Sequence, residues 1–168
     1  MKIEDNFLKQ EEFDKIQKLM MGLNFPWFYT DRILFDDDED KFQFFHIFYN
    51  HGTEKSSFMN ALGAILNIIK PFPILRIKTN LLMRTPNIVE NKFHVDIFNI
   101  SKENLTQWTT SIFYVNTNNG YTKFEDGTKV KSVANRLVTF PANMKHYGTS
   151  CTDENVRVVI NFNYFKNT

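Results

Sequence analysis

The chain has 168 residues, of which 42% are hydrophobic and 23% are charged, and its formal net charge is +1. This balance is typical of one globular domain and excludes a disordered chain, and a general nucleic-acid coat would need a basic excess that is absent. The single cysteine, Cys151, excludes an internal disulfide framework and favours a reducing compartment. The first residues, MKIEDNF, are too acidic for a signal peptide, and the apolar stretch 58–69 is too short to cross a bilayer. We therefore expect a soluble cytoplasmic protein.

The N-terminal part of the chain predicts two helices and one strand. Residues 4–21 place apolar side chains at helical spacing between Lys and Glu, which indicates an amphipathic helix. The acidic run at residues 36–40 is typical of a solvated loop, because no EF-hand spacing follows it. Residues 41–50 are aromatic and β-branched, which predicts a strand. A second amphipathic helix follows, with Ser56 or Ser57 as its cap.

From residue 74 onward the sequence predicts short strands separated by turn signals such as Asn-Gly and Asp-Gly. These predicted strands are residues 74–83, 92–98, 109–116, 121–125, 135–141 and 156–165. Short strands without helices between them indicate a β-sandwich or barrel, with the N-terminal helices bracing one sheet from outside. We expect one mainly β domain, residues 1–168, in which residues 1–73 support a core formed by residues 74–168.

Two histidines and one carboxylate form a predicted metal site. His94 and Asp96 lie two residues apart in a strand-like run, so their side chains point to the same side and can converge on one cation. His146, which follows a later strand and a short turn, provides a third ligand. This ligand set is the facial triad of non-haem Fe(II) oxygenases. A structural zinc site would need four ligands, usually including thiolates, which one cysteine cannot supply.

Arg157 is the second unusual residue, because it lies within the apolar strand VRVVINF. A buried guanidinium is costly unless it is paired, and its planar fork binds a carboxylate in bidentate fashion. Two interpretations follow from the residues alone: an internal salt bridge to Asp or Glu, or the binding of a carboxylate ligand near the predicted metal.

The HVD run, His146 and Arg157, in this order and spacing, resemble the 2-oxoglutarate- and Fe(II)-dependent oxygenases. The runs SIFYVN, NNGYTKF and RVVINFNYF resemble the prolyl-4-hydroxylase-like branch over residues 74–165. The amino-acid sequence of the C-terminal half is similar to that of small oxygenases of tailed phages, including marine ones. The resemblance implies a double-stranded β-helix, which is a jelly roll of two facing sheets with the metal between them. For a phage member, the expected location is the host cytoplasm.

The resemblance also implies roles for individual residues. It assigns three residues to Fe(II), namely His94, Asp96 and His146. It assigns four residues to 2-oxoglutarate, of which Arg157 and Tyr114 reach the distal carboxylate and two asparagines contact the cosubstrate, namely Asn161 and Asn80. The implied reaction is the oxidative decarboxylation of 2-oxoglutarate by O2 to succinate and CO2 while a C–H bond is hydroxylated, with ascorbate as the reductant.

Several substrates are compatible with this resemblance. The leading hypothesis is a prolyl residue of a protein or peptide, and Arg84 and Thr85 are expected to contact it because they border the predicted metal mouth. The alternatives are an oxygenase acting on a nucleic acid or a small molecule, and a non-catalytic cupin-like binding module. A nucleic-acid substrate is disfavoured, because the demethylases of this superfamily carry a second arginine where this chain has Asn163. No membrane partner is expected.

Overall fold

The computed structural model describes residues 1–33, 41–97 and 101–165. The acidic run at residues 36–40, which we expect to form a solvated loop, lies outside the described residues. Among the helices of the described part, none is long and apolar enough to cross a membrane.

The N-terminal part contains more strands than its sequence predicts. Its elements are β1 (Lys2–Glu4), α1 (Gln10–Met20), β2 (Phe28–Thr30), β3 (Gln43–Asn50), β4 (Thr53–Glu54), the 3-10 helix η1 (Met59–Leu62) and α2 (Gly63–Ile69). The helix predicted over residues 4–21 therefore begins too early. Its first residue, Glu4, belongs to β1 and pairs with β9 instead. The side chain of Asn135 bonds both the amide and the carbonyl of Leu8, which holds the chain extended before α1.

The C-terminal part is dominated by strands, as predicted. Its elements are β5 (Ile74–Met83), the short helix α3 (Lys102–Leu105), β6 (Trp108–Tyr114), β7 (Tyr121–Phe124), β8 (Lys129–Lys131), β9 (Arg136–Pro141), β10 (His146–Gly148) and β11 (Val156–Phe165). The prediction of a strand over residues 92–98 is wrong for the described residues 92–97, which make only an isolated bridge, between His94 and His146. Residue 98 lies outside the described residues.

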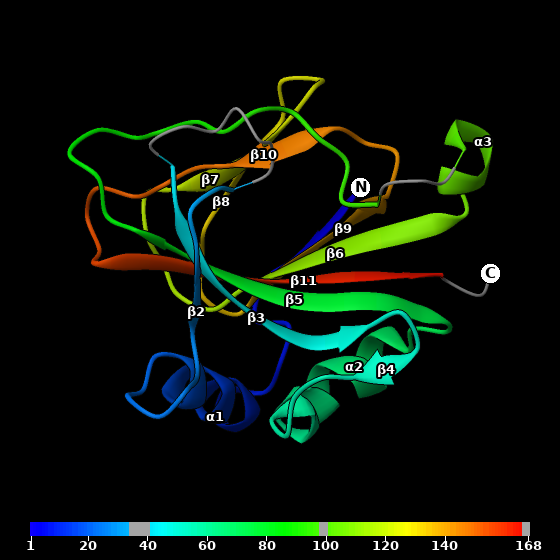
Figure 1. Ribbon diagram of the computed structural model, residues 1–168, viewed down its shortest axis with the longest axis horizontal. Helices are drawn as coiled ribbons and strands as arrows, with labels where there is room; N and C mark the ends of the chain where they lie inside the picture. Colours follow the sequence, from blue (N-terminus) through cyan, green and yellow to red (C-terminus); the bar gives the residue numbers. More distant parts are fainter. Residues whose placement is uncertain (34–40, 98–100, 166–168) are drawn as a thin grey trace.

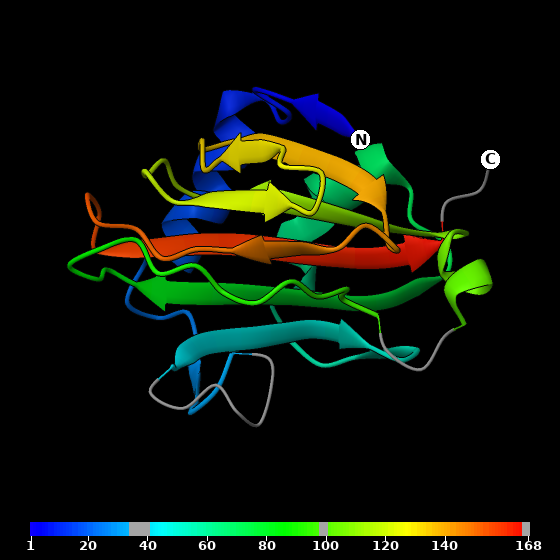
Figure 2. The ribbon, with the colours of Figure 1, turned by 90° about the horizontal axis from the view of Figure 1, so that it is seen from above.

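Two antiparallel sheets face each other, which confirms the mainly β fold expected from the sequence. The large sheet has the strand order β1-β9-β6-β11-β5-β3-β2, with β4 attached to β3, and the small sheet has the order β10-β7-β8. Figure 1 shows the small sheet above the large one and helices α1 and α2 below it. Seen from above, β10 and β7 cross the middle of the large sheet (Figure 2).

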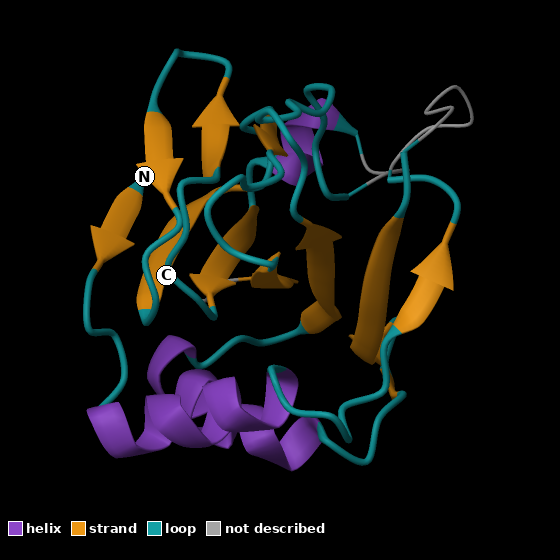
Figure 3. Cartoon of the chain, turned by 90° about the vertical axis from the view of Figure 1, so that its left-hand side faces the viewer, coloured by secondary structure: helices purple, strands orange, loops and turns teal. Residues whose placement is uncertain are grey.

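The central strand β11 explains how the two layers form. Alternate side chains of a strand point to opposite faces. Val158, Ile160 and Phe162 belong to the core shared with α1 and α2, so the helices cover that face of the large sheet (Figure 3). Val159 packs in a second apolar cluster between the sheets, and Arg157 opens on the cavity beside it. One strand therefore provides apolar anchoring below and a polar, chemically active face above.

Candidate metal centre

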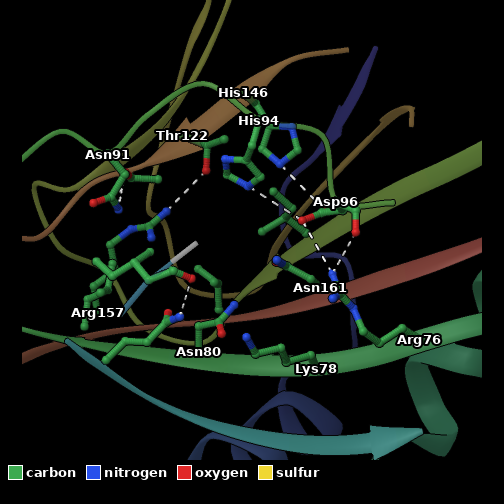
Figure 4. A pocket seen from close by; sticks show the side chains of 16 residues that line it. Arg76, Lys78, Asn80, Asn91, His94, Asp96, Thr122, His146, Arg157 and Asn161 are labelled. Atoms are coloured by element: carbon green, nitrogen blue, oxygen red, sulfur yellow. Dashed lines mark hydrogen bonds and ion pairs between the residues drawn. The ribbon is translucent and has the colours of Figure 1, made fainter. Parts of the chain in front are cut away.

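The structure brings His94, Asp96 and His146 together. Their ligand atoms all lie within 4.8 Å of one another, with His94 Nε2 3.8 Å from one Asp96 oxygen and His146 Nε2 3.7 Å from the other. Asp96 and His146 are buried, and the side chain of His94 is 11% exposed. The two imidazoles lie next to each other, and the carboxylate faces both of them from one side (Figure 4).

The outer nitrogen of each imidazole is held by backbone. His94 Nδ1 lies 3.1 Å from the carbonyl oxygen of Lys92, and His146 Nδ1 lies 3.1 Å from that of Met144. A carbonyl accepts only from a protonated nitrogen, so these bonds place the proton on Nδ1 and leave the Nε2 lone pair toward the centre. Burial lowers the pKa of His94, although Asp96 opposes this, which favours the neutral ring that a metal ligand requires.

Asp96 is oriented by two side chains from neighbouring strands of the large sheet. Asn163 of β11 donates to one carboxylate oxygen at 3.2 Å, and Arg76 of β5 lies 3.7 Å from the other and donates to the Asp96 carbonyl at 3.1 Å. Burial acts to raise the pKa of Asp96, but His146, His94 and Arg76 together lower it below its ordinary value. The carboxylate is therefore ionised and aimed at the centre. The guanidinium beside it is that of Arg76 on β5. Position 163, where the demethylases carry their second arginine, is an asparagine in this chain.

The segment that carries His94 and Asp96 forms the outer rim of the small sheet. Isolated antiparallel bridges pair Glu90 with Thr149 and His94 with His146. This segment therefore runs antiparallel to β10 and to Thr149, the residue that follows β10. The His94 and His146 amides donate to each other's carbonyl oxygens, at 3.0 and 2.9 Å. One bridge is enough to fix two ligands opposite each other, so the site needs no continuous strand.

Arg157 lies at the other end of the same cavity and is 3% exposed. Its Nε donates to Ser132 Oγ at 2.7 Å and its Nη2 to Thr122 Oγ1 at 3.2 Å. Within the described part of the chain no carboxylate pairs with it, so an internal salt bridge does not explain its burial. A Cβ added to Gly148 would lie 3.1 Å from Nη1, and one added to Gly120 only 2.7 Å from Cδ, so both glycines leave room for the side chain.

Tyr114 contacts both Thr122 and the guanidinium of Arg157. Its hydroxyl donates to Thr122 Oγ1 at 2.8 Å, the same oxygen that accepts from Arg157, and its ring lies 5.7 Å from the guanidinium carbon. Tyr114 is fully buried and is not among the residues that line the cavity. The direct contact with a cosubstrate that the resemblance implies stays a prediction, and Thr122 stands between the phenol and the cavity.

Three asparagines face the cavity with unused hydrogen-bonding capacity. Asn80, Asn91 and Asn161 all line it, and each has a buried side-chain oxygen without a hydrogen-bond partner. Asn80 and Asn161, which the resemblance assigns to the cosubstrate, lie on the neighbouring strands β5 and β11 (Figure 4). Unpaired buried amides are costly, which indicates that a polar ligand completes the site.

The sequence analysis missed three functional side chains at this cavity, namely Arg76, Lys78 and Thr122. Thr122 lies in the GYTKF run that carried the resemblance, so the motif contained it without showing its role. Arg76 and Lys78 alternate with apolar residues in the run ILRIKTNLLM, so two cations on one face of a predicted central strand were the available signal.

Other residues considered in the sequence lie elsewhere. Arg84 and Thr85 line a separate pocket of about 220 Å³, which shares Leu82 and Asn91 with the metal-centre cavity. Their contact with a substrate stays a prediction. Cys151 is buried with its thiol donating to the Glu154 carbonyl, and burial raises its pKa.

The donor set fits both ligands that the resemblance implies. Two imidazoles and an ionised carboxylate on one side of a cavity suit a divalent metal such as Fe(II). A buried guanidinium that has no carboxylate partner among the described residues suits a dicarboxylate that reaches from the metal toward Arg157.

Comparison with known proteins gives structural relatives only. No protein-family model matches the sequence, and no curated protein matches it either. Similar solved structures include a prolyl hydroxylase from Trichoplax adhaerens in complex with a hypoxia inducible factor peptide fragment, which is 14% identical over 98% of this chain and 83% of that chain, with a TM-score of 0.67.

Two further structures extend this likeness. A 2OG-Fe(II) oxygenase family protein from Burkholderia pseudomallei is 10% identical over 95% of this chain and 82% of its own, with a TM-score of 0.64. The viral collagen prolyl hydroxylase of Paramecium Bursaria Chlorella virus-1 is 14% identical over 99% and 96%, with a TM-score of 0.55. The chain therefore has the double-stranded β-helix fold of the 2-oxoglutarate- and Fe(II)-dependent oxygenases, with His94, Asp96 and His146 as a candidate facial triad.

Proposed function

We propose that this protein is an Fe(II)- and 2-oxoglutarate-dependent oxygenase that hydroxylates an unactivated C–H bond. The single observation that carries the proposal is the combination in one cavity of the His94, Asp96 and His146 cluster with Arg157, a buried guanidinium that has no carboxylate partner among the described residues. Either feature alone has ordinary structural explanations. Together they provide for a metal and for a dicarboxylate.

Each residue has a defined task in this proposal. His94, Asp96 and His146 hold the metal, which with 2-oxoglutarate and O2 supplies the oxidising chemistry. Arg157 binds the distal carboxylate of 2-oxoglutarate, and Thr122 and Ser132 fix its guanidinium before the ligand arrives. Ile112 and Val159 add apolar surface to the lining of the same cavity.

The finer proposal is that the substrate is a prolyl residue of a protein or peptide. It is supported by the sequence resemblance and by the two prolyl hydroxylases among the similar structures, one of which holds a peptide. The main competitor is another substrate class, such as a small molecule or a nucleic acid. A non-heme alpha ketoglutarate dependent epimerase also shares the fold, at a TM-score of 0.66 and 13% identity, so the fold by itself does not select the reaction. A cytoplasmic location, in the host if a phage encodes the chain, belongs to the same proposal.

The proposal is tested by 2-oxoglutarate turnover without a prime substrate. Purified protein is loaded with Fe(II) and ascorbate, and bound iron and succinate formation are measured. We expect one iron per chain and slow succinate formation in the wild type, and at least a tenfold loss of both in Asp96→Ala. Asp14→Ala, which removes an exposed carboxylate on α1, is the matched control and should behave as the wild type.

The outcomes separate the alternatives. Iron binding without any succinate would support the non-catalytic binding module, and equal iron binding in Asp96→Ala would remove the metal assignment. Mass spectrometry of proteins incubated with the active enzyme should then show one added oxygen on proline. A modification found only on nucleobases would move the protein to the demethylases.

A further inference from the structure

Lys78 is a cation in the centre of the fold for which the described residues provide no hydrogen-bonding or ionic partner. It lies on β5, lines the metal-centre cavity, and its ammonium lies 5.1 Å from the centre of the Phe45 ring. Among the described residues it makes no hydrogen bond and no ion pair. Burial, and secondarily the charge of Arg76, lower its pKa to about 8, with Asp96 opposing. A half-buried ammonium that only touches a ring is costly, and an anion bound beside it would offset this cost.

The proposed metal and cosubstrate leave Lys78 unpaired. Asp96 is the only acidic side chain among the described residues that line the metal-centre cavity, and it faces the metal ligands and Arg76. The distal carboxylate of 2-oxoglutarate is assigned to Arg157. Lys78 pairs in register with Asn161, four residues along β11 from Arg157, which is roughly 13 Å on an extended strand. Ser132 and Thr122 hold the Arg157 guanidinium at one end, and the Lys78 ammonium contacts Phe45 at the other, so we assign a separate anion to each cation.

A second cavity begins where Lys78 lies. Its volume is about 680 Å³, and it shares Arg76, Lys78 and Asp96 with the metal-centre cavity. The remainder of its lining is mixed. Its apolar members are Ile33, Phe45, Ile47, Leu75 and Ile97, and its polar or charged members are Thr30, Arg32, Gln43, Asn50 and His51. Figure 4 shows Lys78 and Arg76 together on the Asp96 side, away from Arg157. This space therefore places two cations, Arg76 and Lys78, next to the metal ligands in a cavity with a mixed lining, which suits a substrate that carries an anionic group.

We propose that Lys78, assisted by Arg76, binds a carboxylate of the prime substrate and so selects substrates that carry an acidic group next to the hydroxylated residue. The inference rests on the proposed oxygenase function and names its substrate class. Arg76 bonds Asp96 and Asn163 through Nη2 and Nε, so its Nη1 still has donors to offer. The carboxylate belongs either to an Asp or Glu side chain or to a free C-terminus beside the target.

The test is a peptide panel titrated calorimetrically against protein loaded with Mn(II) and 2-oxoglutarate in the absence of O2. The panel contains blocked proline peptides with Glu or Asp beside the proline, their Gln or Asn counterparts, and neutral peptides that end in a free carboxylate after the proline. We expect acidic peptides to bind at least tenfold more tightly than their amide counterparts. The free-carboxylate arm shows which source of the anion is used.

Lys78→Met keeps the length of the side chain and removes its charge. We expect it to abolish the tenfold preference for acidic peptides while the 2-oxoglutarate affinity stays within twofold of the wild type. Lys18→Met, an exposed lysine on α1, is the control and should keep the preference.

Three results would overturn the inference: equal binding of acidic and neutral peptides by the wild type, a preference that survives in Lys78→Met, or a tenfold loss of 2-oxoglutarate affinity in that variant. The last would mean that Lys78 holds the cosubstrate. Failure of the oxygenase proposal itself is seen separately, as absent succinate formation in the assay without peptide.

Discussion

The two ends of the cavity differ in how firmly their cations are held. At the Arg157 end, hydroxyls of Ser132 and Thr122 accept from the guanidinium and Tyr114 bonds Thr122 in turn. At the Lys78 end, the ammonium contacts the Phe45 ring and has no hydrogen bond or ion pair within the described part of the chain. Both cations line the same cavity on neighbouring strands.

The difference in how the two cations are held indicates which ligand each end of the cavity binds. A guanidinium fixed before binding loses little conformational entropy when its ligand arrives, which suits a ligand that is the same in every turnover. An ammonium on a flexible stem can follow ligands of different shape, which suits a variable substrate. The comparison predicts that changes at the Arg157 end act on the cosubstrate, whereas changes at the Lys78 end act on the substrate.

The largest expected effect is that of Arg157→Ala on cosubstrate binding. Removing the guanidinium leaves the distal carboxylate in a buried pocket without its partner, which costs about 3 kcal/mol, or roughly 100-fold in Kd. Arg157→Lys should recover only part, because an ammonium cannot make the two-pronged contact. Titration of 2-oxoglutarate into Mn(II)-loaded protein without O2 measures both variants.

The matched control for Arg157 is Arg136→Ala on β9 of the same sheet. Arg136 pairs with Asp5 at the surface, and its loss should leave 2-oxoglutarate affinity unchanged. If Arg157→Ala binds 2-oxoglutarate as the wild type does, another residue holds the distal carboxylate and the comparison of the two ends fails.

A smaller effect is expected from Thr122→Val, which removes the hydroxyl between Tyr114 and Arg157 at nearly constant volume. The guanidinium loses one partner, so 2-oxoglutarate should bind about fivefold to tenfold more weakly, equivalent to about 1 kcal/mol. Tyr114→Phe should have less effect than Thr122→Val, because its hydroxyl acts only through Thr122. The opposite ranking in the same titration would show that the phenol contacts the cosubstrate directly.

The smallest effect concerns pH and the Lys78 end. The pKa of Lys78 in the folded protein is about 8, below its ordinary value of 10.5, so the unfolded chain holds a proton between these pH values that the folded chain has released. Stability therefore rises with pH across this window, and the full penalty of the charge is present below pH 8. Lys78→Met should be more stable than the wild type at pH 7 by about 1 kcal/mol, roughly 3 °C in Tm.

The pH prediction is measured as the difference in Tm between the two proteins from pH 7 to 10. The difference should shrink as pH rises, because groups that titrate equally in both proteins cancel. Lys18→Met should show no such trend. If the difference in Tm stayed constant from pH 7 to 10, burial of the Lys78 ammonium would cost no stability. The Lys78 ammonium would then be as well stabilised by its surroundings as the Arg157 guanidinium.

The sequence predicted the candidate site best where a short run of residues specifies both the ligand types and the direction of their side chains. HVD predicted two side chains on one side of the chain, and the structure places both beside His146 even though the predicted strand is only a bridge. Spacing by two requires only locally extended backbone, so it survives the loss of the strand. The first helix was predicted too long because the bond network of Asn135 with Leu8, which holds the chain extended, joins residues far apart in sequence.

The sequence by itself determined the apolar alternation of β11, the mainly β character and the candidate ligands, because each depends on residue types at short spacing. Only the tertiary structure decided that Arg157 has no acidic partner in the described chain, that Thr122 lies between it and Tyr114, and that Lys78 stands unpaired near Asp96. Pairing and burial depend on contacts between strands that are distant in sequence. Local patterns do not encode those contacts, because which strands become neighbours is set by the packing of the whole sheet.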